Sequence, residues 1–251
     1  MLSIISSAKT LNFKAISFQE STIPLFLSTT NYLLEILKNY SQEQLTEIMN
    51  ISSSLAQLNR QRFQNFEKQE LKQAIFAYDG DVYNNIKIEE LNHKQLNFLQ
   101  SHLLIMSGLY GALRPLDDIR PYRLEMAAKL PAIIADIKNL ADFWQEKITN
   151  YINQTLKRHK NKYLLNLASI EYSSAIAISR LKYPMINVFF KENKNGKLQT
   201  VGINAKKARG NMVNFIATHA IDNPCELKNF SYLNYEFSVA DSSENNLVFI
   251  K

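Results

Sequence analysis

Residues 106–115 read MSGLYGALRP, and this stretch is the starting point for the fold because it contains two of the six glycines of the chain. Gly108 and Gly111 lie three positions apart, with a leucine and a tyrosine between them. Glycine lets the backbone turn tightly with its N–H groups pointing outward, and such groups near helix ends bind a phosphate without reading a base sequence. The pattern predicts a helix-hairpin-helix element that contacts phosphate. The alternative is a helix that ends at Gly108 and continues as a loop.

A charged segment follows directly, with the sequence LDDIRPYRLEM at residues 116–126. Arg114, Arg120 and Arg123 lie close in sequence to Tyr122, and arginines beside a tyrosine can clamp a phosphate and stack on a base. A loop with this density of charge is more often a surface whose charges pair with one another. The neighbouring Asp117 and Asp118 are poor joint metal ligands, because adjacent residues on a helix point in different directions.

A second basic segment, NAKKARGNM at residues 204–212, lies where a predicted strand meets a predicted helix. Lys206, Lys207 and Arg209 at the start of a helix oppose its macrodipole, which costs a few tenths of a kcal/mol for each cation. An anion docked between these cations and the free N–H groups of the helix would offset that cost. We therefore predict an anion site here rather than an ordinary basic surface.

Strand and helix patterns alternate along the chain and predict a mixed α/β fold in a single domain over residues 1–251. The expected strands are 2–6, 74–78, 163–168 and 247–250, together with 185–192 and 198–204, which an Asn-Gly turn joins as a hairpin. Ser41 and Gln44 predict a capping box at the start of a helix. The other expected helices are 31–40, 55–66, 91–106, 140–156 and 205–220.

Composition favours an anionic partner, since 29 lysines and arginines outnumber 23 acids. The only cysteine, Cys225, excludes an intrachain disulfide and fits a reducing compartment. The four histidines show no metal-binding spacing, so we expect no metal and no cofactor. Neither a signal peptide nor a membrane-spanning stretch is predicted, so we expect a cytoplasmic protein. No standard catalytic motif is present, which favours a binding protein over an enzyme.

Residues 106–126 resemble the signature of the YaaA family of bacterial peroxide-stress proteins. Four further blocks agree with this family in order and position, so the resemblance covers essentially the whole chain: ISSAKTL at 5–11, GDVYNNI at 80–86, NLASIEY at 166–172 and AKKARGNM at 205–212. The sequence departs from the family pattern at three loop positions, which are Ser7, Asn85 and Asn234.

The resemblance implies a compact fold peculiar to the family, a positively charged cleft and a helix-hairpin-helix element. It also implies sequence-independent binding to duplex or branched DNA, and a role in limiting oxidative DNA damage and free iron under hydrogen peroxide. Carried over onto this chain, the hairpin comprises Ser107, Gly108, Leu109, Tyr110 and Gly111. The expected DNA-binding residues of the cleft are Lys9, Arg114, Arg120, Tyr122, Arg123, Lys206, Lys207 and Arg209.

Two other functions stay open at the level of sequence. The first is an enzyme, a nuclease or a nucleotide-processing protein, that uses polar residues at strand ends. Its candidate residues are Asp79, Asp81, Asp117, Arg123, Ser169, Glu171 and Tyr172. The second is direct iron binding, for which the sequence offers no cluster of ligands.

Overall fold

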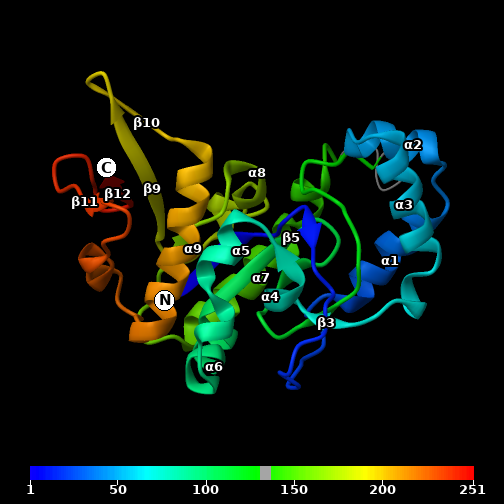
Figure 1. Cartoon of the computed structure of the whole chain (residues 1–251), viewed down its shortest axis with the longest axis horizontal. Coiled ribbons are helices and arrows are strands. Elements are labelled where there is room, and N and C mark those ends of the chain that lie inside the picture. Colours follow the sequence, from blue (N-terminus) through cyan, green and yellow to red (C-terminus); the bar gives the residue numbers. More distant parts are fainter. Residues whose placement is uncertain (131–136) are drawn as a thin grey trace.

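The computed structural model describes residues 1–130 and 137–251, and a mostly parallel sheet runs through its centre (Figure 1). Within these residues the sheet has eight strands, in the order β11-β12-β9-β8-β1-β5-β6 with β10 paired to β9. The bounds of its strands are β1 Leu2–Ser6, β5 Leu103–Ser107, β6 Gly111–Leu113, β8 Leu164–Asn166, β9 Met185–Lys194, β10 Lys197–Gln199, β11 Glu236–Phe237 and β12 Asn246–Ile250. The mixed α/β class predicted from the sequence is confirmed.

The centre of the sheet is built from short apolar runs. β1 pairs in parallel with β5 on one side and with β8 on the other. Every residue of β5 is buried, as is usual for a parallel strand covered on both faces. The helix expected over 91–106 was therefore too long: α6 ends at His102, and β5 begins at the next residue. An apolar run of this kind has the same appearance in a buried helix and a buried strand.

The segment predicted to be a helix-hairpin-helix is a β-hairpin. β5 and β6 pair antiparallel, and residues 108–110 form the turn between them. Both glycines serve close packing here. A Cβ on Gly108 would lie 2.4 Å from the Leu124 carbonyl oxygen. Gly111 has a φ of +72°, and a Cβ there would lie 2.6 Å from the Trp144 ring. The prediction was wrong because two glycines mark a tight turn without specifying whether helices or strands flank it.

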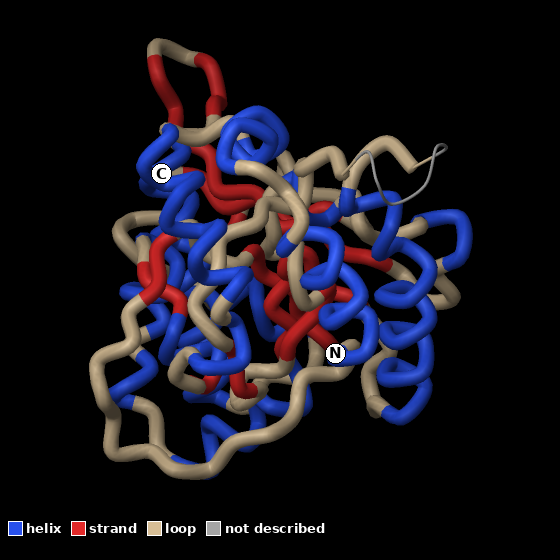
Figure 2. Tube along the Cα trace, turned by 90° about the vertical axis from the view of Figure 1, so that its right-hand side faces the viewer, coloured by secondary structure: helices blue, strands red, loops and turns tan. Residues whose placement is uncertain are grey.

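The second predicted hairpin is confirmed. β9 and β10 pair antiparallel, and Asn195 and Gly196 between them both have positive φ, as the Asn-Gly turn requires. The second strand is shorter than expected, because α9 begins at Gly202. Figures 1 and 2 show this hairpin projecting from the molecule, and Figure 1 places it at the opposite end from α1, α2 and α3.

Helices flank the sheet and agree with most of the predicted ranges. Their bounds are α1 Leu27–Lys38, α2 Gln42–Met49, α3 Ser53–Gln64, α4 Ala74–Ala77, α5 Asp81–Ile86, α6 His93–His102, α7 Leu140–Arg158, α8 Ile170–Ser173 and α9 Gly202–His219. The capping box at Ser41 and Gln44 is confirmed. The strand expected at 74–78 is instead the short helix α4 followed by β4. No helix among the described residues has the length and apolar character needed to cross a membrane.

Small elements complete the described chain. Two short antiparallel pairs join β2 Thr10–Leu11 to β4 Tyr78–Asp79 and β3 Lys72–Gln73 to β7 Asp118–Ile119. The 3-10 helices are η1 Phe66–Lys68, η2 Ile88–Glu90, η3 Ile178–Arg180 and η4 Pro224–Asn229.

Helices α5 and α9 lie side by side (Figure 1). A Cβ at Gly210 would lie 2.1 Å from the Val82 carbonyl oxygen, so the two backbones meet where glycine has no side chain. Asn211 reinforces this contact, since its amide nitrogen donates to the Asn85 side-chain oxygen at 3.0 Å. The close approach positions the first half of α9 beside the chain that leads into α5.

Candidate functional site

The strand order reverses at β1, and this reversal locates the candidate site. The chain passes from β1 to β5 on one side and later returns to β8 on the other side. In open α/β sheets, ligands bind at the carboxyl ends of the strands where such a reversal occurs. A cleft of about 410 Å³ lies at this position and is lined by Ser6 at the end of β1, by Ser7 after it, and by Leu167 and Ser169 after β8.

Hydroxyl groups hold the two strand ends together at the floor of the cleft. The Ser169 amide donates to Ser6 Oγ at 3.0 Å, and Tyr83 donates from its hydroxyl to the Ser6 carbonyl oxygen at 2.9 Å. Tyr172 hydrogen-bonds the Ser7 side chain, and burial raises the pKa of Tyr172 to about 12. Both tyrosines are therefore neutral at pH 7 and present hydroxyls rather than charges.

Three cations reach the cleft, and they come from two segments far apart in sequence. Lys9 follows β1, and its side chain is 67% exposed. Lys206 and Arg209 come from α9. These two residues are three positions apart and so share one face of the helix, whereas Lys207 points elsewhere and does not line the cleft.

The predicted reason for the α9 cations needs correction. α9 begins at Gly202, so Lys206 and Arg209 lie beyond the first turn and away from the free N–H groups of the helix start. What places these side chains at the cleft is the close contact between α9 and α5, not the helix dipole.

Arg209 has an unusual environment for a cation. Its Nε is buried and has no hydrogen-bond partner, and the described residues give its guanidinium no ion pair. Burial lowers the pKa of Arg209 below its ordinary value. A guanidinium stays protonated in proteins, so burial leaves this one as a charge without a counterion. Buried charges are ordinarily paired, so the lack of a charged partner among the described residues sets Arg209 apart.

Acidic groups line the same cleft, so it is not uniformly basic. Asp79, Asp81 and Glu171 stand among the lining residues with the three cations. Glu171 also accepts a hydrogen bond from the Ala127 amide at 3.1 Å. The positively charged cleft that the family resemblance implies is therefore, in the described residues, a cleft of mixed charge.

The hairpin residues of the predicted DNA site lie in the core. Ser107, Leu109 and Tyr110 are each at most 2% exposed, and Gly108 and Gly111 are buried as well. In this structure they present no surface to a phosphate. Tyr122 is also buried, with its hydroxyl 2.6 Å from Ser107 Oγ and 2.5 Å from the Tyr78 hydroxyl.

The three arginines of the charged segment make internal contacts outside the cleft. Arg114 pairs with the fully buried Asp117 at 2.7 Å. Arg120 donates to the Gln69 carbonyl oxygen. Arg123 pairs with Glu125 at 2.9 Å, and Glu125 lies 3.9 Å from Lys9 at the edge of the site. The more ordinary interpretation of this segment, charges that pair with one another, describes Arg114 and Arg123.

The fold brings together residues that the sequence assigned to two different hypotheses. Lys9, Lys206 and Arg209 came from the DNA hypothesis. Five came from the enzyme hypothesis and line the same cleft: Asp79, Asp81, Ser169, Glu171 and Tyr172. Asp117 and Arg123 do not line it. Tyr83 was missed, although its place in the GDVYNNI block was a usable signal.

Comparisons with known proteins agree with the sequence blocks. A family model described as "Peroxide stress protein YaaA" matches residues 1–241. The chain is 65% identical to a UPF0246 protein of Rickettsia bellii (strain OSU 85-389) over 252 residues, which covers the full length of both chains. It is 64% identical to a UPF0246 protein of Rickettsia africae (strain ESF-5) and 62% identical to one of Rickettsia conorii, again with full coverage of both chains.

Proposed function

The chain belongs to the YaaA family of peroxide stress proteins, and on that premise we propose that it binds DNA without sequence preference by holding a backbone phosphate in the cleft at the ends of β1 and β8. The family membership supports a role in oxidative stress. The DNA partner, its duplex or branched form, and the limiting of DNA damage and free iron belong to the proposal.

The unpaired Arg209 carries this proposal. Its guanidinium is half-buried at the cleft, with a buried Nε that has no hydrogen-bond partner and no ion pair among the described residues, and Lys206 lies on the same helix face. A guanidinium offers a fork of N–H donors that matches two phosphate oxygens. Lys9 adds a third cation to the lining of the cleft, and the net charge of +6 favours a long polyanion over a neutral ligand.

The acidic side chains of the cleft fit a site that holds a single phosphate group. Asp79, Asp81 and Glu171 repel a second phosphate placed beside them, so the cleft holds one phosphate rather than a run of them. Contacts to phosphate carry no base information, which accounts for the absence of sequence preference.

DNA binding at several salt concentrations, compared between two arginine variants, tests the proposal. The anisotropy of a labelled duplex is followed with wild type, Arg209→Gln and the matched control Arg60→Gln, which removes an exposed arginine from α3. The plot of log K against log salt has a negative slope, and loss of one phosphate contact makes that slope shallower by about 0.9. We expect that loss, with weaker binding, for Arg209→Gln alone. Equal slopes for all three folded proteins would show that Arg209 touches no phosphate.

A second candidate function is an enzyme that acts on a phosphate-bearing small molecule. The observation that favours it is the position of three carboxylates and Arg209 in one cleft at a reversal of strand order. A nucleoside triphosphate and a supercoiled plasmid are incubated with the protein and Mg²⁺. Turnover that Asp81→Asn abolishes, while Arg60→Gln leaves it unchanged, supports the enzyme. Absence of turnover in both assays counts against it.

A further inference from the structure

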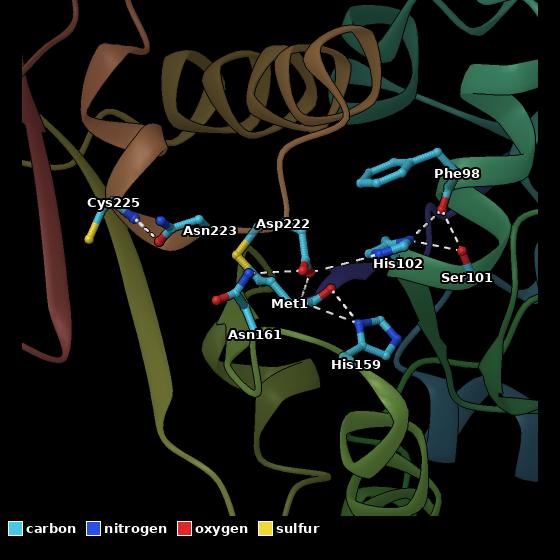
Figure 3. Close-up of polar contacts among 9 residues, drawn as sticks. All are labelled: Met1, Phe98, Ser101, His102, His159, Asn161, Asp222, Asn223 and Cys225. Carbon is cyan, nitrogen blue, oxygen red and sulfur yellow. Dashed lines mark hydrogen bonds and ion pairs between the residues drawn. The ribbon is translucent and has the colours of Figure 1, made fainter.

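A second group of polar side chains lies at the amino end of β1, at the opposite end of this strand from the cleft. His102 ends α6 directly before β5, His159 follows the last residue of α7, and Asp222 lies just after α9. Figure 3 shows the three side chains around Met1, the residue that precedes β1. His102 and His159 precede the amino ends of β5 and β8, whereas the cleft lies at the carboxyl ends of the strands.

The three side chains offer metal-ligating atoms at short range. One atom from each of His102, His159 and Asp222 lies within 4.8 Å of the others, and no other such group occurs among the described residues. His102 Nε2 is 3.8 Å from Asp222 Oδ1. A tetrahedral ion with bonds of about 2.0–2.1 Å holds its ligand atoms about 3.3 Å apart. Small side-chain rotations therefore suffice to bring the three atoms onto one ion.

Hydrogen bonds orient His102 and Asp222 toward a common centre, whereas His159 Nδ1 lies 3.0 Å from the Met1 carbonyl oxygen. His102 Nδ1 lies 2.9 Å from the Phe98 carbonyl oxygen, so this nitrogen carries the proton and Nε2 presents its lone pair to Asp222. Asn161 donates to Asp222 Oδ2 at 2.9 Å, which leaves Oδ1 directed at the centre. A histidine that ligates a metal characteristically donates its other ring N–H to a carbonyl or carboxylate in this way.

Charge and access also fit a cation. The terminal ammonium of Met1 contacts Asp222 Oδ1, so positive charge is already drawn to this position, and a divalent ion would take its place. Burial lowers the pKa of both His102 and His159 below the ordinary value for histidine. A pocket of about 610 Å³ lined by all three residues gives an ion a route from solvent.

We propose that His102, His159 and Asp222 form a binding site for a divalent first-row transition ion. Two imidazoles and one carboxylate are a donor set that such ions take, whereas Mg²⁺ and Ca²⁺ prefer oxygen ligands alone. The three protein donors leave further coordination positions for water. This site is independent of the cleft and of the proposed DNA binding.

Metal titration of the full chain without a polyhistidine tag tests this site. Zn²⁺ is titrated against a chromogenic chelator, and the absorption of Co²⁺ bound to the protein reports its coordination. We expect about one equivalent of each ion, visible Co²⁺ bands, and no binding of Mg²⁺ in a parallel titration. His102→Gln and His159→Gln should each weaken Zn²⁺ binding at least about tenfold.

His219→Gln is the matched control. His219 ends α9 as His102 ends α6, and its Nδ1 lies 3.0 Å from the Phe215 carbonyl oxygen in the same arrangement. It belongs to no group of ligands among the described residues. Its substitution should leave Zn²⁺ affinity unchanged. Circular dichroism confirms that each variant is folded, and Zn²⁺ should raise the melting temperature of wild type and His219→Gln only.

Two results would overturn the proposal. One is a wild-type protein that binds neither Zn²⁺ nor Co²⁺ at micromolar concentration, which would leave the group as an ion pair around Met1. The other is binding that the folded His102→Gln and His159→Gln variants retain at wild-type affinity, which would place the ion elsewhere.

Discussion

Gly210 sets the distance between α9 and α5, and through it the position of Lys206 and Arg209. Its backbone approaches the Val82 carbonyl oxygen so closely that an added Cβ would lie 2.1 Å away. Backbone atoms cannot move aside as a flexible side chain can. The glycine in the AKKARGNM block therefore serves the site indirectly, by helix packing.

Gly210→Ala should accordingly destabilise the protein. Overpacking of this kind costs about 1–3 kcal/mol, and we expect a loss of that size in the free energy of unfolding measured with urea. Gly202→Ala is the control, since a Cβ at Gly202 meets nothing within 4 Å. It should leave stability unchanged or slightly higher. Equal stability of the two variants would contradict the close helix contact.

At the residue scale, Lys9, Lys206 and Arg209 are the predicted cations that line the cleft, and the two on α9 do so for another reason than the predicted one. Lys206 and Arg209 were selected for a helix start that lies elsewhere, but their spacing on one helix face is a property of the sequence. The metal-ligating group was out of reach, because His102, His159 and Asp222 are far apart along the chain and only the strand order brings them together.

Helix α2 begins with a complete capping box, which is a purely local feature. Ser41 Oγ accepts a hydrogen bond from the Gln44 amide at 3.2 Å, and the Gln44 side chain accepts one from the Ser41 amide at 2.8 Å. Ser41→Ala should therefore lower the free energy of unfolding by about 1 kcal/mol. Ser21→Ala removes an exposed serine outside any helix and should change nothing. A Ser41→Ala variant as stable as Ser21→Ala would show that the cap contributes no stability.

Local signals of this kind explain how much of the element pattern was predictable. The capping box, the Asn-Gly hairpin and the amphipathic helix α7 each depend on a few neighbouring residues. The strand β5 and the β5–β6 hairpin depend on burial within the whole sheet, which no local pattern reports. For the same reason the sequence indicated a tight turn at residues 107–111 and gave the wrong flanking structure.

At the scale of the whole molecule, buried tyrosines couple stability to alkaline pH. Burial raises the pKa of Tyr78, Tyr83 and Tyr122 well above the ordinary value of 10. The folded state therefore keeps these protons at a pH where the unfolded state releases them. Because the unfolded state then binds fewer protons, stability falls as pH rises above about 10.

Urea unfolding between pH 7 and pH 11 measures this dependence. The free energy of unfolding should show no loss from these tyrosines up to about pH 10. Above that pH it should decline by as much as about 1.4 kcal/mol per pH unit for each buried tyrosine. Tyr122→Phe should show a shallower decline than wild type, because it removes one of the protons. A midpoint that holds steady to pH 11 would mean that the tyrosines ionise while the protein stays folded.

If the cleft, and not the glycine hairpin, holds phosphate, two neighbouring lysines of α9 should differ in their effect on DNA binding. Lys206 lines the cleft and Lys207, its neighbour on α9, does not. The measurement is the affinity of Lys206→Gln and Lys207→Gln for the same labelled duplex at several salt concentrations. Lys206→Gln should bind more weakly, with a salt slope that is shallower by about 0.9, and Lys207→Gln should stay close to wild type. Equal losses in both variants, or a loss in Lys207→Gln alone, would contradict phosphate binding in the cleft.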